Sequence, residues 1–384
     1  MIDIGNGDPI ILTKALISCR SVTPQNDGAI EQLSHWLEEI GFKCDILNFK
    51  EDGTDDVLNL WARIGNEQGP SLCFAGHTDV VPEGDEASWS ADPFEANEID
   101  GKIIGRGATD MKGAIASFVS ATKKFLDERE NFVGSISFII TGDEEGIAIN
   151  GTKKLLNWMK EKNISFDDCI VGEPTNPNKL GEMIKIGRRG SVNGVITVTG
   201  EQGHVAYPHL ARNPIPILLS ILNDLTSGEL DKGNEHFQPS NLEITSVDVG
   251  NKATNVIPNS ASANFNIRYN DNFNKETIEN EIKRRLNNFE NVFSLKLEHS
   301  GDSFLTKPGK LVHDLSEIIF DKTGITPDLS TSGGTSDARF IKNYGNVVEF
   351  GLISETMHQI DESVDVKDIN DLTDIYYKVL TKYF

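Results

Sequence analysis

The chain has 384 residues, which exceeds the size at which one hydrophobic core usually stops growing, so we expect two domains. Its 36 basic and 59 acidic side chains give a formal net charge of -23, which disfavours binding to nucleic-acid phosphates or to anionic lipid. The first residues lack a signal-peptide pattern and no apolar run is long enough to cross a bilayer, so a cytoplasmic location without nucleic-acid or membrane partners is expected.

The predicted elements of the first half alternate between helices and strands. Asp8-Pro9 predicts the start of a helix that continues to Cys19, and a second helix covers 30–40. Short apolar runs at 71–75 and 135–140 predict strands, separated by a helix with an apolar stripe from Met111 to Leu126. This alternation predicts an α/β catalytic domain with a mixed, mainly parallel sheet.

The pattern changes from about Ser191. Strand, helix, strand, strand, helix and strand follow in that order as far as Leu297, which is the β-α-β-β-α-β unit of α+β domains. The tail from about Ser303 returns to helical and glycine-rich segments. We therefore expect an inserted domain at 190–301 within a first domain made of 1–189 and 302–384.

The four cysteines indicate which atoms a metal site would use. Cys19, Cys44, Cys73 and Cys169 are scattered, with no Cys-x-x-Cys spacing. This argues against a thiolate zinc site and against a disulfide framework. Any metal would therefore be held by His, Asp and Glu.

Two polar positions follow the strand at 71–75 and the glycine-rich segment before Met111. His77 and Asp79 are two residues apart, so they point to the same face of an extended chain, and Asp79 can orient a metal-bound His77. A surface histidine beside a turn aspartate is the alternative. Asp110 stands at the mouth of the next helix, where its alternative role is that of an N-cap.

Three consecutive acids follow the strand at 135–140, and two of them are Glu144 and Glu145. Adjacent carboxylates repel each other unless a cation lies between them or one is protonated. One can therefore ligate a metal while its neighbour takes a proton from an attacking water. Glu173 follows another short strand and His358 lies near the C-terminus; each taken singly is an ordinary surface residue.

Taken together, these segments resemble the five metal-site signatures of a di-zinc family that includes aminoacylases, carboxypeptidases and acetylornithine deacetylase. They are His77-Thr78-Asp79, Gly107-Ala108-Thr109-Asp110-Met111-Lys112-Gly113, Gly142-Asp143-Glu144-Glu145, Gly172-Glu173-Pro174 and His358. The resemblance implies two zinc ions per chain, for which cobalt or manganese can substitute. It also implies a cis peptide bond after Asp110.

The same resemblance assigns roles to the metal-site residues. Asp110 would bridge the two zinc ions, with His77 and Glu173 completing one site and Glu145 and His358 the other. Glu144 would be the general base of amide hydrolysis, and Asp79 would orient His77.

The inserted domain carries a second set of signals. The segment 203–209 resembles the family loop whose first histidine, here His204, stabilises the tetrahedral oxyanion across a homodimer interface. The segment 254–258 resembles the family loop in which an asparagine, here Asn255, contacts substrate. A histidine satisfied within its own turn is the alternative for both His204 and His209.

The segments 187–191, 304–309 and 333–340 resemble the branch of this family that removes succinyl groups from amino-acid amines. An acidic protein that binds such a multiply carboxylated substrate needs local cations and oriented N–H donors. The resemblance implies that the substrate contacts are Arg188, Ser191, Tyr207, Arg268, Gly334 and Thr335, besides Asn255. The alternatives are a deacetylase or broad aminoacylase with the same metal residues, and a zinc-dependent binding protein without turnover.

Overall fold

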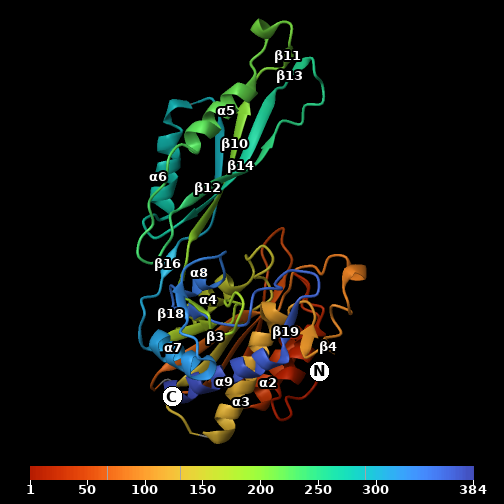
Figure 1. Cartoon of the computed structure of the whole chain (residues 1–384), viewed down its shortest axis with the longest axis vertical. Coiled ribbons are helices and arrows are strands. Elements are labelled where there is room, and N and C mark those ends of the chain that lie inside the picture. Colours follow the sequence, from red (N-terminus) through yellow and green to blue (C-terminus); the bar gives the residue numbers. More distant parts are fainter. Residues whose placement is uncertain (67, 130, 290) are drawn as a thin grey trace. The chain divides into compact units, whose positions relative to one another are not determined.

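The computed structural model describes residues 1–66, 68–129, 131–289 and 291–384, and divides into two compact units (Figure 1). Unit 1 comprises Met1–Ile186, Thr306–Ser330 and Ser336–Phe384. Unit 2 comprises Gly187–Leu305 and Thr331–Thr335, so most of it is one continuous insertion. The expected roles of the two domains, catalysis for 1–189 with 302–384 and dimerisation for 190–301, remain predictions.

The core of unit 1 is an eight-stranded sheet in the order β1-β2-β6-β3-β7-β18-β8-β17. The strands are β1 (Lys43–Phe49), β2 (Val57–Gly65), β6 (Ser135–Thr141), β3 (Ser71–His77), β7 (Asp168–Val171), β18 (Asn346–Glu349), β8 (Met183–Lys185) and β17 (Asp328–Ser330). Four neighbouring pairs are parallel, namely β6/β3, β3/β7, β7/β18 and β8/β17, and the other three are antiparallel. The predicted mixed, mainly parallel sheet is therefore confirmed.

The helices of unit 1 are α1 (Pro9–Ile17), α2 (Ala29–Glu39), α3 (Gly113–Glu128), α4 (Thr152–Glu161), α7 (Lys310–Thr323), α8 (Ala338–Ile341) and α9 (Val366–Tyr383). The predicted start of α1 is correct, because the side chain of Asp8 accepts a hydrogen bond from Ile10 N at 2.8 Å. Helices α3 and α9 pack together, and Phe118 of α3 stacks on Phe74 of β3 with ring centroids 4.4 Å apart. This packing fixes α3, and with it the loop that precedes it.

Shorter elements complete unit 1. Strands β4 (Asn97–Ile99), β5 (Lys102–Ile104) and β19 (Ser363–Asp365) form a small sheet in the order β19-β5-β4. A 3₁₀ turn, η1, covers Glu86–Ser88, and a π-helical turn, η2 (Ala108–Lys112), leads into α3. Among the described residues, no helix is long and apolar enough to span a membrane.

Unit 2 has the predicted β-α-β-β-α-β order. Its principal elements are β10 (Gly190–Thr199), α5 (Pro214–Leu225), β12 (Asn241–Asp248), β14 (Ser260–Tyr269), α6 (Lys275–Arg285) and β15 (Ser294–Gly301). The four strands form an antiparallel sheet in the order β12-β14-β10-β15. Alternate residues of β14, such as Phe265 and Ile267, are buried in one core with Leu218 of α5 and Ile282 of α6. Both helices therefore pack on the same face of the sheet (Figure 1).

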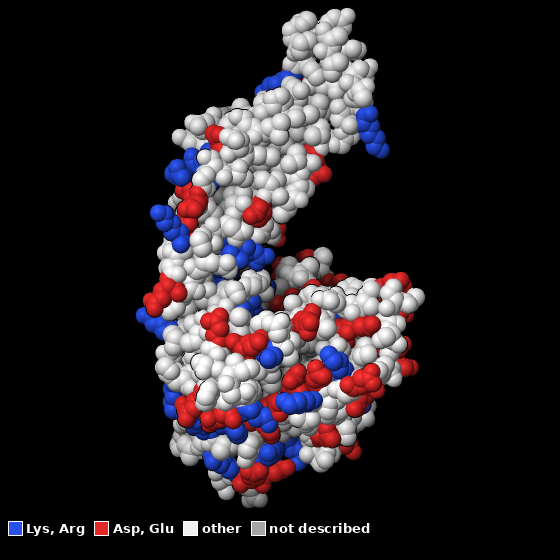
Figure 2. All heavy atoms as spheres, viewed as in Figure 1, with Lys and Arg blue, Asp and Glu red and all other residues white. Residues whose placement is uncertain are grey.

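The remaining short elements of unit 2 are β9 (Gly187–Arg188) paired with β16 (Phe304–Leu305), β11 (Gly203–His204) paired with β13 (Val256–Ile257), and the 3₁₀ turns η3 (Pro208–Leu210) and η4 (Asn287–Phe289). On the face of unit 1 seen in Figure 2, acidic and basic side chains are interspersed, and that view shows no continuous basic area.

Candidate metal centre

The ends of three parallel strands bring polar side chains to one edge of the unit 1 sheet. His77 is the last residue of β3, and Glu144 and Glu145 follow β6 after a short turn. Glu173 lies two residues beyond Val171, where β7 ends. Strand β3 pairs in parallel with β6 on one side and with β7 on the other, so the carboxyl ends of the three strands lie at the same edge. Four of the predicted site residues therefore come from neighbouring strand ends.

Asp110 enters the same site from the turn before α3. Gly107 has a φ of +84°, a left-handed conformation that glycine adopts readily, and it turns the chain into η2. The peptide bond between Asp110 and Met111 is cis, as the family resemblance predicts. The side chain of Asp110 does not cap α3, because its oxygens lie 3.2 Å from His77 Nε2 and 3.1 Å from His358 Nε2.

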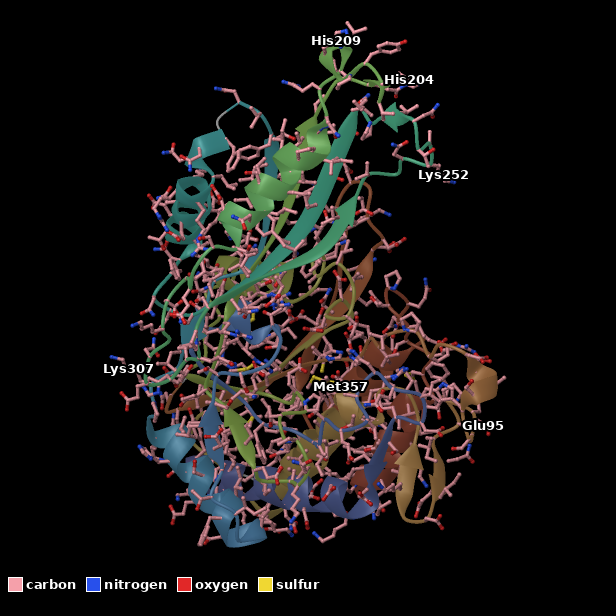
Figure 3. The ribbon with its side chains drawn as sticks, turned by 45° about the horizontal axis from the view of Figure 1, so that its top comes forward. Glu95, His204, His209, Lys252, Lys307 and Met357 are labelled. Atoms are coloured by element: carbon pink, nitrogen blue, oxygen red, sulfur yellow. The ribbon has the colours of Figure 1, made fainter. Side chains whose placement is uncertain are left out.

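His358 closes the site from the C-terminal part of the chain. Its loop is marked in Figure 3 by its neighbour Met357, and His358 itself has a φ of +61°. Its Nε2 lies 2.8 Å from Glu145 Oε1. A residue more than 200 positions from Glu145 is thus brought into hydrogen-bonding contact with it.

Among the described residues, three groups of possible metal ligands lie at this site, each with its ligand atoms within 4.8 Å of one another. One contains His77, Asp110 and Glu173, and a second contains Asp110, Glu145 and His358. Asp110 thus belongs to two groups. A third group joins His77 with Glu144 and Glu145.

The donor set fits divalent metal ions. The groups consist of imidazole nitrogens and carboxylate oxygens, and no cysteine belongs to any of them among the described residues. Such donors suit zinc and related first-row ions. The acids outnumber the histidines, and His77, Asp110 and Glu173 are buried, so added positive charge would relieve the repulsion between the carboxylates.

The histidine pKa values reflect the excess of negative charge. Burial lowers the pKa of His77, but the hydrogen bond and charge of Asp110, with the charges of Glu173 and Asp79, raise it well above its usual value. Hydrogen bonds to Asp110 and Glu145 raise the pKa of His358 to about 10. Each imidazole therefore holds a proton strongly. A metal ion must displace that proton before it can bind to the ring nitrogen.

Asp79 lies behind the site and is fully buried. The sequence predicts that its carboxylate orients His77, but that carboxylate lies 3.7 Å from Nδ1, and the atom 2.9 Å away is the carbonyl oxygen of Asp79. The carboxylate instead accepts the backbone N–H groups of Glu144 and Glu145, at 3.2 and 3.0 Å. Burial raises the pKa of Asp79 to about 6 against the lowering effects of His77 and these N–H donors. Asp79 therefore holds the glutamate loop in place.

Glu144 is surrounded by other acids. Burial raises its pKa well above the usual value, and the charges of Glu173 and Asp337 raise it further. A carboxylate with a raised pKa accepts a proton more readily than an ordinary glutamate does.

Three residues of the site were missed by reasoning from the sequence. Asp143, the first of the three consecutive acids, accepts the N–H groups of residues 148–150 at 2.9–3.2 Å and so shapes the loop after Glu145. Arg106 and Glu362 form a buried ion pair with a distance of 2.7 Å. The available signals were an arginine between two glycines and a glutamate shortly after His358, and neither is distinctive alone.

Unit 2 brings its own predicted substrate residues together in groups. Arg188 is buried, and its Nη1 donates to the carbonyl oxygens of Ser332 and Gly334, at 3.4 and 3.2 Å, next to Thr335. Ser191 and Arg268 are partners in the register of β10 and β14. Both contact Asn266, which donates to Ser191 Oγ at 3.2 Å and accepts from Arg268 Nε at 3.1 Å.

A further group lies around β11 and β13, near His204 and His209 in Figure 3. The ring of His204 is 5.8 Å from that of Tyr207, and His204 Nδ1 accepts the N–H of Ala206 at 3.1 Å. The carbonyl of Asn255 accepts the N–H of Val205 at 3.1 Å. His204, Tyr207 and Asn255 are exposed, so they are available to a ligand or to another chain.

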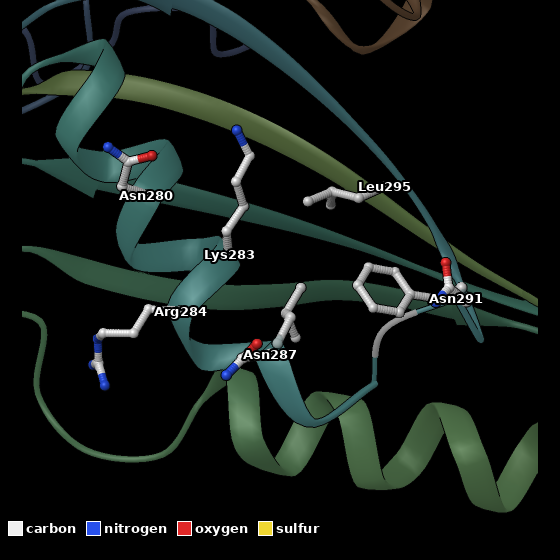
Figure 4. A pocket seen from close by; sticks show the side chains of 8 residues that line it. Asn280, Lys283, Arg284, Asn287, Asn291 and Leu295 are labelled. Atoms are coloured by element: carbon white, nitrogen blue, oxygen red, sulfur yellow. The ribbon is translucent and has the colours of Figure 1, made fainter.

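A pocket of about 520 Å³ lies elsewhere in unit 2, beside α6 and β15 (Figure 4). Its described lining residues are Asn280, Lys283, Arg284, Leu286, Asn287, Asn291, Phe293 and Leu295. None of them is a predicted site residue.

Comparison with known proteins identifies close relatives. A succinyl-diaminopimelate desuccinylase from Rhodospirillum centenum is 53% identical to this chain, with 98% of this chain and 97% of the relative covered. The protein of the same name from Methylorubrum populi is 55% identical, with 98% of each chain covered.

Solved structures of low sequence identity share the fold. An M20 family metallo-carboxypeptidase from Sulfolobus solfataricus has a TM-score of 0.81 at 17% identity, with 98% of this chain and 99% of that one covered. A Bacillus subtilis protein described as a dinuclear metal-binding peptidase of the M20 family has a TM-score of 0.68 at 18% identity, with 97% of each chain covered. In addition, residues 73–382 match the model of peptidase family M20/M25/M40. The chain therefore belongs to peptidase family M20/M25/M40.

Proposed function

We propose that the chain is a two-zinc amide hydrolase that cleaves N-succinyl-L,L-2,6-diaminopimelate to succinate and L,L-2,6-diaminopimelate, a reaction of lysine and diaminopimelate biosynthesis. The observation that carries the two-metal chemistry is the membership of Asp110 in two ligand groups. The choice of substrate is supported by relatives at 53–55% identity over nearly the whole chain that are named succinyl-diaminopimelate desuccinylases.

Two zinc ions would share the carboxylate of Asp110. His77 and Glu173 would complete one site, and Glu145 and His358 the other, because these residues form the two ligand groups around Asp110. Cobalt or manganese can substitute, since such sites discriminate by geometry more than by raw affinity. When bound, the two metals would polarise an amide carbonyl and lower the pKa of a water molecule.

Glu144 is proposed as the general base. It takes a proton from the attacking water and delivers it to the departing amine, which the raised pKa of its carboxyl group favours. Asp79 supports this role through the backbone, because its carboxylate holds the N–H groups of Glu144 and Glu145. The positions of Glu144 and Glu145 relative to each other are thereby fixed.

The carboxylates of the substrate require cationic partners, which unit 2 supplies. We assign this role to Arg188 and Arg268, with Ser191, Tyr207, Asn255, Gly334 and Thr335 as further contacts. A guanidinium group binds a carboxylate through two parallel hydrogen bonds, which gives orientation as well as affinity.

We also propose that unit 2 forms a homodimer and that His204 stabilises the oxyanion in the site of the partner chain. Two features support this: His204 is exposed, and β12 and β15 are edge strands of the four-stranded sheet. Mixing His204→Ala subunits with Glu144→Gln subunits tests the sharing, provided that subunits exchange. Recovered activity supports a site completed in trans, and its absence contradicts it.

Two alternatives share the metal residues. An acetylornithine deacetylase or broad aminoacylase would differ in the acyl pocket, and the names of the close relatives favour the succinyl substrate. A non-catalytic zinc-dependent binding protein would have no use for Glu144 as a base. The expected cytoplasmic location stays a prediction.

A substrate panel on zinc-loaded protein tests the assignment. Succinyl should be preferred over acetyl on the diaminopimelate scaffold by roughly 10⁴-fold, because an acetyl group leaves the polar groups built for the succinyl carboxylate unpaired. Arg188→Ala and Arg268→Ala should weaken this preference or substrate affinity without changing the zinc content. Lys275→Ala, which removes an exposed cation from α6, is the matched control. Efficient hydrolysis of N-acetylornithine with negligible action on N-succinyl-L,L-diaminopimelate would refute the substrate assignment but not the two-metal chemistry.

A further inference from the structure

A buried ion pair connects the two loops that carry Asp110 and His358. Glu362 is 0% exposed and Arg106 is 2% exposed, and Arg106 Nη1 lies 2.7 Å from Glu362 Oε2. Arg106 stands four residues before Asp110, and Glu362 stands four residues after His358. The pair therefore joins the chain near one proposed metal ligand to the chain near another.

The second carboxylate oxygen of Glu362 holds the backbone at Asp110 itself. Glu362 Oε1 accepts the N–H of Thr109 at 3.0 Å and the N–H of Asp110 at 3.1 Å. In addition, the carbonyl oxygen of Glu362 accepts the N–H of Gly105 at 2.9 Å. One residue thus binds the main chain at three points of the segment that places Asp110.

The loop of His358 is held from the other side of the same ion pair. Arg106 Nη1 also donates to the carbonyl oxygen of Gln359, the residue after His358, at 3.2 Å. Thr356 closes the loop at its base, where its hydroxyl donates to Ser363 O at 3.0 Å and accepts from Ser363 N at 3.1 Å. The separation of the Asp110 carboxylate from the His358 imidazole therefore depends on Arg106 and Glu362.

A contribution to stability alone does not account for this arrangement. Removing two charges from water costs about as much as their attraction returns, and buried ion pairs can often be replaced by apolar residues without loss of stability. The guanidinium group of Arg106 is held further by Pro82 O at 3.3 Å and by the ring of Trp89, whose centroid is 5.2 Å away. Such a rigid charged pair is suited to fixing the position of neighbouring groups.

We propose that Glu362 and Arg106 are positioning residues that set the spacing of Asp110 and His358 and thereby the affinity of the site for its metal ions. This inference rests on the proposed two-metal site. Neither side chain is a ligand. They act through the backbone. In other sites, removal of the groups that hydrogen-bond to metal ligands typically costs about 10–100-fold in metal affinity or activity.

The variant Glu362→Gln tests the proposal. A glutamine offers a single acceptor oxygen, so either the N–H groups at Thr109 and Asp110 or the guanidinium of Arg106 loses its partner. We expect Co²⁺ and Zn²⁺ to bind to this variant about 10–100-fold more weakly than to the wild type. The affinities are measured by calorimetry and by competition with a chelator. The visible spectrum of the Co²⁺-loaded protein should also change, because the ligands shift. Glu281→Gln, which breaks the pair between Glu281 and the buried Arg285 in unit 2, is the matched control and should bind both metals as the wild type does.

The outcomes separate this inference from the proposed function. If the wild type binds two metals and Glu362→Gln binds them with unchanged affinity and spectrum, the positioning role is overturned while the metal site stands. If the wild type binds no metal at these residues, the proposed function itself fails. If Glu362→Gln does not fold, the variant Arg106→Lys provides the test. Lysine keeps the positive charge but cannot make the forked contacts of the guanidinium group to Gln359 and Pro82. Weaker metal binding by folded Arg106→Lys supports the proposal, and wild-type binding contradicts it.

Discussion

Replacing Glu144 by Gln should separate metal binding from turnover. The backbone N–H of Glu144, not its side chain, is held by Asp79 at 3.2 Å, and Gln has nearly the same size, so the loop should keep its shape. The proposed ligands around Asp110 also remain in place. We therefore expect close to two zinc ions per chain in the variant.

Turnover should fall because an amide cannot accept the proton of the attacking water. A general base contributes about 10²–10⁴-fold, which corresponds to ~2.7–5.4 kcal/mol in the activation free energy.

The assay combines zinc content by atomic absorption with kcat for succinate release, measured on the same preparations. Circular dichroism of both proteins controls for folding, and Glu281→Gln controls for the loss of a carboxylate far along the sequence. A variant that lost metal along with activity would show that Glu144 is a ligand, and near-normal kcat would refute its role as the base.

Further predictions concern the metals and the stability of the two units. Chelation should abolish activity, and added zinc should restore it; activity that survived complete metal removal would contradict the two-metal mechanism. His358→Ala should lower the zinc content from two towards one per chain by atomic absorption, since its Nε2 lies 3.1 Å from Asp110 and 2.8 Å from Glu145. Phe118→Ala should lower the free energy of unfolding by about 3–5 kcal/mol in denaturant titrations, because the fully buried ring stacks on Phe74. Hydrogen bonds from Arg284 and Arg285 lower the pKa of Glu281 to about 2 from the ordinary 4.5, so its stabilising effect is present above pH 4.5 and is lost as the pH falls towards 2. The difference in unfolding free energy between wild type and Glu281→Gln should therefore shrink over that interval.

The sequence predicts best what is encoded locally. The helix start at Asp8 and the alternation in β14 depend on neighbouring residues, so capping and periodicity identify them. Four of the five metal-site motifs are also local, and each of these follows a strand or precedes a helix. By contrast, the sequence does not mark β1 as a strand, because β1 lies at the edge of the sheet with much of it exposed and lacks a clear apolar alternation.

Contacts between distant segments escape such reasoning for a physical reason. The carboxylate of Asp79 holds residues 65 and 66 positions later in the chain, and its neighbours in sequence indicate only that it lies near His77. A motif therefore gives the set of residues at a site, while the partner of each atom depends on the packing of the strands.

The half of the site around His358 shows that this dependence on strand packing extends to segments far apart in the sequence. Its loop is placed by the pairing of β19 with β5, in which Ser363 lies opposite Ile104. That pairing brings Glu362 to the N–H groups of Thr109 and Asp110, although Glu362 stands 253 and 252 residues from them. No local pattern marks a glutamate for this contact, because its partners are backbone groups that any residue possesses. Residues that position a metal site through the backbone are therefore found from the structure, even where the ligands themselves can be predicted from motifs.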